Sequence, residues 1–152
     1  MQRSVSDYQG IQVRTGVDIV SVSRVMRLLD ENPNIIDSLF TNREISYCRD
    51  KSRKCYEHMA ARFAAKEAVF KALSACPGHR LSWTEVEIIN ELAGRPYVVL
   101  HGDTALLVQR SGLISLDISL SHTTDLAIAQ VVTVWQGNGQ WHEEGNAKCA
   151  SI

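Results

Sequence analysis

Hydrophobic residues change their spacing along the chain, and these changes predict the secondary structure. From residue 11 to residue 19, apolar and polar residues alternate, which is typical of a β-strand. Residues 62–73 hold four alanines and no glycine or proline, so they predict the centre of one long helix, spanning about 55–75. Alternation returns at 83–89 and 115–121. Residues 95–100 would pair with 83–89 across a turn, and 126–135 are apolar enough for a central strand.

Shorter helices connect these segments. Residues 22–30 follow a serine that can cap a helix. Thr41 and Glu44 have the spacing of a capping box, in which each side chain accepts the other's backbone N–H. Asp103 is placed to cap a further helix that ends at Gly112. This order of elements predicts an α+β domain in which an antiparallel sheet packs against a long central helix.

Length and composition predict one globular domain. The chain has 152 residues, and we expect the domain to span 1–135, with 136–152 as a polar tail of a kind that is often disordered. A formal net charge of -1 predicts no general attraction to nucleic acid, and no apolar run is long enough to cross a membrane. The four cysteines form no CxxC pair, and the N-terminus does not resemble a signal peptide. We therefore expect reduced thiols in a cytoplasmic protein.

The long helix carries a carboxylate among apolar residues. On a helical wheel Glu67 falls between Phe63 and Phe70, and Lys66 and Lys71 flank the same face. An ionised carboxylate in such a stripe costs on the order of several kcal/mol unless a cation or hydrogen-bond donors meet it. The pattern fits a structural Glu–Lys pair or a Glu at the rim of the core. It fits equally a metal ion at Glu67 with phosphates at the lysines.

Two other candidate residues lie where a strand meets a turn. Asp18 is near the end of the first strand, two residues after Gly16, which leaves room for close approach. His122 follows the strand 115–121. Each alone is more typical of a turn, but two carboxylates from separate elements, Asp18 and Glu67, suit Mg²⁺ with its waters and substrate phosphates. Zinc is disfavoured because no cysteine or histidine lies near either acid in the sequence.

Other motifs are absent or weak. The sequence has no P-loop and no GxGxxG, which disfavours ordinary nucleotide-triphosphate and dinucleotide folds. The basic run 49–54 is most often a solvated turn, but it would also suit an acidic partner. Arg24 and Arg27 would lie about one turn apart on the helix 22–30.

Several blocks of the sequence, taken together, resemble the holo-acyl-carrier-protein synthases, which are the small single-domain type of phosphopantetheinyl transferase. The resemblance covers about residues 15–134. The blocks are Gly16-Val17-Asp18-Ile19-Val20 with Arg24 following, the helical segment Arg62-Phe63-Ala64-Ala65-Lys66-Glu67-Ala68-Val69-Phe70-Lys71-Ala72-Leu73, Ser119-Leu120-Ser121-His122-Thr123 and, more weakly, Gly94-Arg95-Pro96. Their order and separations make the resemblance specific, whereas each block alone could arise by chance.

This resemblance implies a phosphopantetheinyl-transferase-like fold and a reaction. The family moves 4'-phosphopantetheine from coenzyme A to a serine hydroxyl of an apo acyl carrier protein, requires Mg²⁺ and releases adenosine 3',5'-bisphosphate. It usually forms a homotrimer with active sites between subunits. The implied roles are metal binding by Asp18 and Glu67, phosphate binding by Arg62, Lys71 and His122, a loop near the adenine at Gly94 and Pro96, and carrier binding by Arg24, with Arg27 beside it.

The expected chemistry agrees with these roles. Transfer at a pyrophosphate needs charge neutralisation and in-line positioning more than a covalent protein nucleophile. We expect Glu67, Lys71 and Lys66 to be catalytic, with Lys71 stabilising the leaving phosphate. The proton of the carrier serine would go to a metal-organised water, to Lys66 or to Glu44.

Two other functions compete with the transferase. A non-catalytic carrier- or coenzyme A-binding module would bind without turnover, and a Mg²⁺-dependent nucleotide hydrolase would cleave coenzyme A without a carrier. Both acids and both lysines of the helix are present, which favours the active transferase. The carriers of fatty acid, polyketide and peptide synthases all present a similar acidic helix, so the sequence does not select among them.

Overall fold

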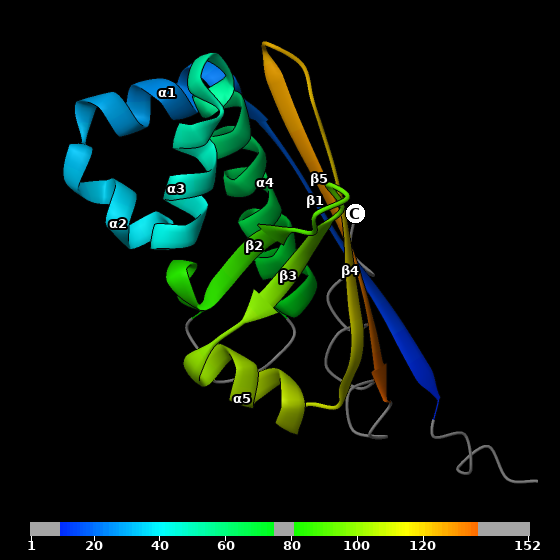
Figure 1. Cartoon of the computed structure of the whole chain (residues 1–152). Helices are drawn as coiled ribbons and strands as arrows, with labels where there is room; N and C mark the ends of the chain where they lie inside the picture. Colours follow the sequence, from blue (N-terminus) through cyan, green and yellow to red (C-terminus); the bar gives the residue numbers. More distant parts are fainter. Residues whose placement is uncertain (1–9, 75–80, 137–152) are drawn as a thin grey trace, which may run out of the picture.

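The computed structural model describes residues 10–74 and 81–136. The strands are β1 (Ile11–Ser21), β2 (Val86–Asn90), β3 (Pro96–Leu100), β4 (Leu113–His122) and β5 (Leu126–Gln136). The α-helices are α1 (Val22–Glu31), α2 (Ile36–Leu39), α3 (Asn42–Asp50), α4 (Cys55–Leu73) and α5 (Gly102–Arg110). Helix α4 lies between an antiparallel sheet of order β1–β5–β4 and the helices α1 to α3, and the β2–β3 hairpin also packs on α4 (Figure 1). The predicted α+β class is confirmed.

The strand predictions agree with the pairing in the structure. Strand β5 is central, as its apolar composition predicted, and it pairs antiparallel with both β1 and β4. The predicted hairpin is formed by β2 and β3. Residues 83–85 form a short 3-10 helix before β2, so the strand begins at Val86 and not at Trp83.

Side-chain caps begin α1 and α3 where the sequence predicted. The Ser21 side chain accepts the N–H of Arg24 at the start of α1, and the capping box of Thr41 and Glu44 opens α3. The prediction for α5 is wrong, because Asp103 lies inside its first turn. The carboxylate of Glu85 accepts the backbone N–H groups there, so an anion from outside the helix complements its N-terminus.

The buried face of α4 is a stripe of small residues. Six alanines of this helix are at most 2% exposed: Ala60, Ala61, Ala64, Ala65, Ala68 and Ala72. Small side chains allow the strands to approach closely, and Gly16 of β1 contributes to this contact. A Cβ built on Gly16 would lie 1.9 Å from the carbonyl oxygen of Ala68. The sequence from 60 to 72 therefore sets the distance between α4 and the sheet.

The aromatic residues of α4 lie beside this stripe. Phe63 and Phe70 are only partly buried, and both pack against Trp83, with ring centroids 5.0 and 4.9 Å away. The prediction that they form the core stripe around Glu67 is wrong, because alanines and not aromatics face the sheet. Glu67 is half-buried, and it lines a cavity next to Phe63.

Four apolar residues of β1 point away from α4, whereas Val20 packs against the core. The exposed fractions are 70% for Ile11, 62% for Val13, 55% for Val17 and 59% for Ile19. The alternate residues of β1, including Gly16 and Asp18, face the helix instead. Ile128 and Val132 of β5 are also exposed, so the outer face of the sheet is apolar over two neighbouring strands.

Some predictions concern residues beyond the described ranges. The segment 137–152, expected to be a polar tail, lies outside them, and so do Cys76 and Cys149. The domain boundary at residue 135 therefore stays a prediction. Cys48 and Cys55 are free thiols. No helix in the described ranges is long and apolar enough to cross a membrane.

Glu87 is a buried carboxylate whose ionisation should stabilise the fold. It is 3% exposed and accepts hydrogen bonds from Thr41 Oγ1 at 2.6 Å and Arg43 at 3.4 Å, and lies 3.0 Å from His101 Nε2. Burial alone would raise the pKa of Glu87, but these partners lower it below its usual value. Alternation along β2 places Glu87 on the face opposite Val86, and its polar partners explain why Glu87 is buried as well as Val86.

The lowered pKa gives a pH prediction. A carboxyl whose folded pKa is below its unfolded pKa adds stability above the unfolded value, near 4.5, and loses it as the pH falls through the folded pKa. In Glu87→Gln the melting temperature should be lower than wild type at pH 7, and the difference should shrink between pH 5 and pH 3. Scanning calorimetry of both proteins measures this. A constant difference from pH 7 to pH 3 would contradict it.

Candidate active site

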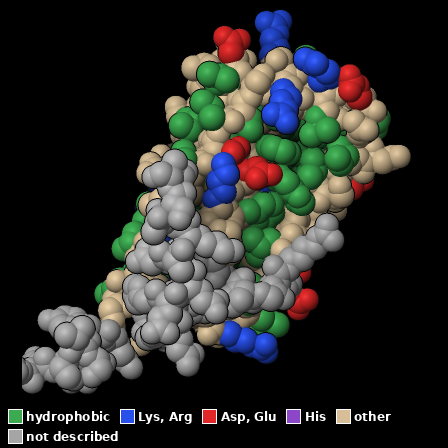
Figure 2. Space-filling model, turned by 180° about the vertical axis from the view of Figure 1, so that it is seen from behind, with side chains coloured by type: hydrophobic (Ala, Val, Ile, Leu, Met, Phe, Trp, Pro, Cys, Tyr) green, Lys and Arg blue, Asp and Glu red, His purple; other side chains and the backbone are tan. Residues whose placement is uncertain are grey.

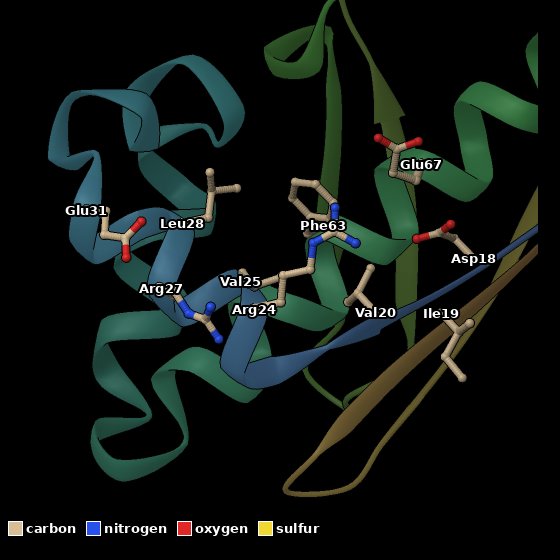
Figure 3. A pocket seen from close by; sticks show the side chains of 10 residues that line it. All are labelled: Asp18, Ile19, Val20, Arg24, Val25, Arg27, Leu28, Glu31, Phe63 and Glu67. Atoms are coloured by element: carbon tan, nitrogen blue, oxygen red, sulfur yellow. The ribbon is translucent and has the colours of Figure 1, made fainter.

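A cavity of about 450 Å³ lies where the end of β1 and helix α1 face α4 (Figure 3). Its polar lining residues are Asp18, Arg24, Arg27, Glu31 and Glu67, and its apolar lining residues are Ile19, Val20, Val25, Leu28 and Phe63. Seen from behind, acidic and basic side chains lie next to a hydrophobic area of the surface (Figure 2). The cavity thus combines an apolar wall with charges of both signs.

Two carboxylates share this cavity, and we call Asp18 and Glu67 the acid pair. Their side chains come from β1 and α4 and lie side by side (Figure 3). The Nζ of Lys71 donates to Asp18 Oδ1 at 2.7 Å and to the carbonyl oxygen of Val17 at 2.8 Å. Burial and the charge of Asp18 raise the pKa of Glu67, and Lys71 offsets this only in part. One ammonium group therefore does not neutralise both carboxylates.

The acid pair fits Mg²⁺ better than zinc. No group of three or more His, Cys, Asp or Glu residues within 10–74 and 81–136 is arranged to hold a metal. Zinc sites commonly require three or four such ligands, whereas Mg²⁺ keeps several waters and binds through one or two carboxylates plus substrate phosphates. Because burial and the charge of Asp18 disfavour the ionised form of Glu67, a further cation beside the acid pair would stabilise that form. The predicted metal ligands are thus brought together.

Lys66 is not in the cavity. Its side chain is 0% exposed, and its Nζ donates to Glu44 Oε2 at 2.7 Å and to the carbonyl oxygens of Leu39 and Trp83. The prediction that Lys66 flanks the same face as Lys71 is wrong, because its aliphatic chain follows the buried side of α4. A residue in this position cannot contact a substrate in the cavity, so the predicted catalytic role of Lys66 is not supported. Burial lowers the pKa of Lys66, and Glu44 partly offsets this.

Glu44 is the buried partner of Lys66, and the prediction that it accepts the proton of the carrier serine is also wrong. It caps α3 and also turns inward, because Oε2 accepts the N–H of Thr41 at 2.8 Å while Oε1 accepts that of Ile88 at 2.9 Å. One carboxylate therefore does both, since each of its oxygens accepts a different backbone N–H. At 1% exposure Glu44 cannot reach a hydroxyl group bound in the cavity.

Arg62 is the centre of a second cluster of charged residues. It is 2% exposed, its guanidinium lies 4.2 Å from the centroid of the Tyr47 ring, and it donates to Asn90 Oδ1 at 2.7 Å. Its Nε is buried and has no hydrogen-bond partner among the residues the structure describes. No carboxylate within 10–74 and 81–136 pairs with this buried cation, which is costly, so this position favours an anionic ligand.

His122 belongs to the same cluster. Its Nδ1 lies 3.3 Å from Glu57 Oε2, and its ring packs at 5.3 Å from that of His58. Burial and the nearby Arg62 and His122 lower the pKa of His58. We call Arg62, His58 and His122 the basic cluster. Only His58, four residues before Arg62 and so on the same face of α4, could have been inferred from its spacing.

The predicted loop near the adenine adjoins the basic cluster. Asn90 accepts from Arg62, and its own Nδ2 donates to the carbonyl oxygen of Gly94 at 3.0 Å. Gly94 has a φ of 90°, a conformation that favours glycine, in the turn before β3, and Pro96 is the first residue of that strand. The structure therefore brings together Arg62, Gly94 and the neighbourhood of Pro96.

The acid pair and the basic cluster are separated within one chain. Arg62 precedes Glu67 by five residues, which corresponds to about 140° around the helix. Glu57, which contacts His122, precedes Glu67 by ten residues, or about 15 Å along the helix axis. A ligand that contacts both groups would have to pass around α4 or bridge two chains.

Comparisons with a family model and with individual relatives all indicate the same protein family. A family model described as the 4'-phosphopantetheinyl transferase superfamily matches residues 14–131. A holo-[acyl-carrier-protein] synthase of Geotalea daltonii is 41% identical over 119 residues, covering 78% of this chain and 94% of the relative. One of Moorella thermoacetica is 40% identical over 117 residues, covering 77% and 90%.

Solved structures are similar over the same part of the chain. A synthase–coenzyme A complex from Chronobacterium ammoniagenes has a TM-score of 0.73 at 29% identity, covering 82% of this chain and 98% of that one. The holo-[acyl-carrier-protein] synthase of Helicobacter pylori in complex with coenzyme A has a TM-score of 0.66 at 30% identity, covering 78% and 98%.

Proposed function

Because the chain belongs to the 4'-phosphopantetheinyl transferase superfamily, we propose that its acid pair and basic cluster are the two halves of a holo-[acyl-carrier-protein] synthase site. The enzyme transfers phosphopantetheine from coenzyme A to an acyl carrier protein. In this reaction a serine oxygen of the carrier bonds to the phosphorus of the pantetheine arm, and adenosine 3',5'-bisphosphate leaves. The observation that carries the residue assignment is that two carboxylates, Asp18 and Glu67, line one cavity while the Lys71 ammonium is bonded to Asp18.

The acid pair would hold Mg²⁺, which when bound supplies positive charge for the pyrophosphate of coenzyme A. Lys71 is half exposed at the cavity edge, 2.7 Å from Asp18, so it can turn from that carboxylate to the leaving phosphate. Lys66 and Glu44 are buried, so neither accepts the proton of the carrier serine. We propose a water ordered by the acid pair as the acceptor.

The basic cluster would bind the phosphates of coenzyme A. Arg62 is only 2% exposed, so a phosphate oxygen reaches its unpartnered Nε only if the Tyr47 ring or Asn90 moves, and it would then supply the missing acceptor. Asn90 connects Arg62 to the turn at Gly94, and His58 lies between Arg62 and His122 in the cluster, so we propose that these residues share one ligand. Because the basic cluster and the acid pair lie apart within one chain, we propose that coenzyme A bridges two subunits.

We propose a homotrimer, formed through the apolar outer face of β1 and β5. An exposed apolar face of this kind is typical of an interface. In Val13→Arg the protein should run as a monomer and lose transfer, because the two half-sites would no longer meet. Light scattering after size exclusion measures the mass. Leu106→Arg, on α5 and 49% exposed, is the matched control and should leave both unchanged. A Val13→Arg protein that keeps its mass would contradict this interface.

The carrier would dock on α1. Arg24 and Arg27 are exposed at the outer edge of the cavity and would meet the acidic helix of the carrier. In the double variant Arg24→Glu, Arg27→Glu, the KM for the carrier should rise by about tenfold or more, which corresponds to ~1.4 kcal/mol, while the KM for coenzyme A stays the same. The exposed Arg110→Glu serves as the charge-matched control. An unchanged KM for the carrier would remove both arginines from the interface.

The proposed function is tested by intact-mass analysis of a panel of apo carriers incubated with the protein, coenzyme A and Mg²⁺. The panel holds carriers from fatty acid, polyketide and peptide synthases. We expect at least one of them to gain the mass of the phosphopantetheine arm. Binding of carriers or coenzyme A without any gain in mass would instead support a non-catalytic module. The free thiols of Cys48 and Cys55 agree with a cytoplasmic location, which stays a prediction.

A further inference from the structure

Glu44 and Lys66 form a buried ion pair whose polar groups are fully used. The three N–H groups of the Lys66 ammonium meet Glu44 Oε2 at 2.7 Å, Leu39 O at 2.7 Å and Trp83 O at 2.8 Å. Glu44 in turn accepts the N–H groups of Thr41 and Ile88. One ammonium thus fixes the end of α2, the start of α3 and the 3-10 helix before β2 against α4.

This pair is connected to the acid pair through an aromatic contact. Lys66 holds the backbone of Trp83 by its carbonyl oxygen, and the Trp83 ring contacts both Phe63 and Phe70. On α4 these two residues lie one turn before and one turn after Glu67. Phe63 also lines the cavity together with Glu67. The Trp83 ring therefore supports both sides of the helix turn that presents Glu67.

We propose that Lys66 is a positioning residue, which acts through Trp83 and the two phenylalanines to hold Glu67 in the geometry that a metal ion requires. Lys66 does not touch the cavity and moves no proton in the reaction. The inference rests on the proposed function, since the geometry concerned is that of the proposed metal ligand. Residues that orient a metal ligand commonly change metal affinity by about 10–100-fold when they are replaced.

Stability alone does not account for an ion pair at this position. A buried ion pair is often no more stabilising than apolar residues of the same volume, because both charges lose their hydration. The ammonium has a directional role that a methyl group lacks, since it aligns two carbonyl groups and one carboxylate from separate elements. Lys66 also feels the charges of Glu87 and Arg62, which belong to β2 and α4.

The test compares Lys66→Met and Trp83→Leu with wild type. Lys66→Met removes the ammonium, while Trp83→Leu keeps the ion pair and removes the ring. Binding of Mn²⁺ as a probe is followed by electron paramagnetic resonance of the free ion, well below the melting temperature of each protein. Both variants should bind Mn²⁺ about tenfold more weakly, and the double variant should be no weaker than the single ones. Their kcat should fall while the KM for the carrier stays unchanged.

Val108→Ala is the control for a general loss of stability. Val108 is a buried core residue of α5, so its truncation lowers the melting temperature without touching the Trp83 contacts. Its Mn²⁺ affinity should equal that of wild type. The same result in Lys66→Met, a lower melting temperature with unchanged Mn²⁺ affinity, would reduce Lys66 to a structural residue and overturn the proposal.

Other outcomes are also decisive. A shifted pH–rate profile of Lys66→Met with wild-type Mn²⁺ affinity would give Lys66 a role in proton transfer and overturn the positioning role. If Lys66→Met does not fold, Trp83→Leu decides alone, because unchanged Mn²⁺ affinity in that variant contradicts the proposal. Failure of the proposed function is seen separately, as a wild-type protein that modifies no carrier.

Discussion

Glu67→Gln is expected to abolish transfer and leave the fold intact. Glutamine has the shape of glutamate but lacks the charge that would hold Mg²⁺, so kcat should fall by about 10²–10³-fold or more. The apo protein should be at least as stable as wild type at neutral pH. Burial and Asp18 raise the pKa of Glu67, so its ionised form costs stability above the unfolded pKa near 4.5. Glutamine removes that cost.

Two measurements separate activity from stability in this variant. Intact-mass kinetics give the transfer rate, and scanning calorimetry at pH 7 gives the melting temperature of the apo protein. Asp37→Asn is the control, because Asp37 is an exposed carboxylate of α2 outside the cavity, and it should keep full activity. A Glu67→Gln protein with wild-type kcat would remove Glu67 from the metal site. A large fall in its melting temperature would contradict the unfavourable burial of the Glu67 charge beside Asp18.

Gly16→Ala should have the largest effect on stability. Its Cβ would lie 1.9 Å from the carbonyl oxygen of Ala68, 2.9 Å from the carbonyl carbon and 3.0 Å from the N of Ala72. These are backbone atoms of α4, so only a movement of β1 away from the helix relieves the overlap. We expect a loss of about 3 kcal/mol or more in the free energy of unfolding. Transfer should also fall, because Asp18 lies two residues further along β1.

Gly94→Ala is the comparison, measured by urea unfolding at equilibrium. Gly94 has a positive φ of 90° but no atom within 4 Å of an added Cβ. Its replacement should cost only the backbone strain, on the order of 1–3 kcal/mol and less than at Gly16. Equal losses at the two positions would mean that the contact between β1 and α4 can relax, and the close approach would not be a constraint.

Local patterns were sufficient where the stabilising contacts are local. The capping box of Thr41 and Glu44, the hairpin of β2 and β3 and the long helix α4 depend on residues close in sequence, and all three predictions are confirmed. The face of α4 that enters the core was not predictable from hydrophobicity. The partner of α4 is a sheet that approaches closely at Gly16, so alanines are buried where Phe63 had been expected.

The site residues, too, were predictable only where short sequence blocks define them. The sequence blocks led to Asp18, Glu67 and Lys71, and the structure brings these three together. Lys66 was misplaced because a lysine adjacent to a site residue on a helix points about 100° away from it, and here that direction is the interior. The contacts of Glu57 and Tyr47 with the basic cluster could not be recognised, because they join residues of α3, α4 and β4 that are far apart in the sequence.

The proposed mechanism of phosphopantetheine transfer depends most on Mg²⁺ binding by the acid pair. The most direct test is the rate at which wild-type protein modifies an apo carrier with coenzyme A, measured by intact mass after removal of divalent ions and during titration with Mg²⁺. We predict no gain in mass without the metal and a rate that saturates as Mg²⁺ is added, with no such response in Glu67→Gln. Transfer at the full rate in the metal-free protein would contradict the account.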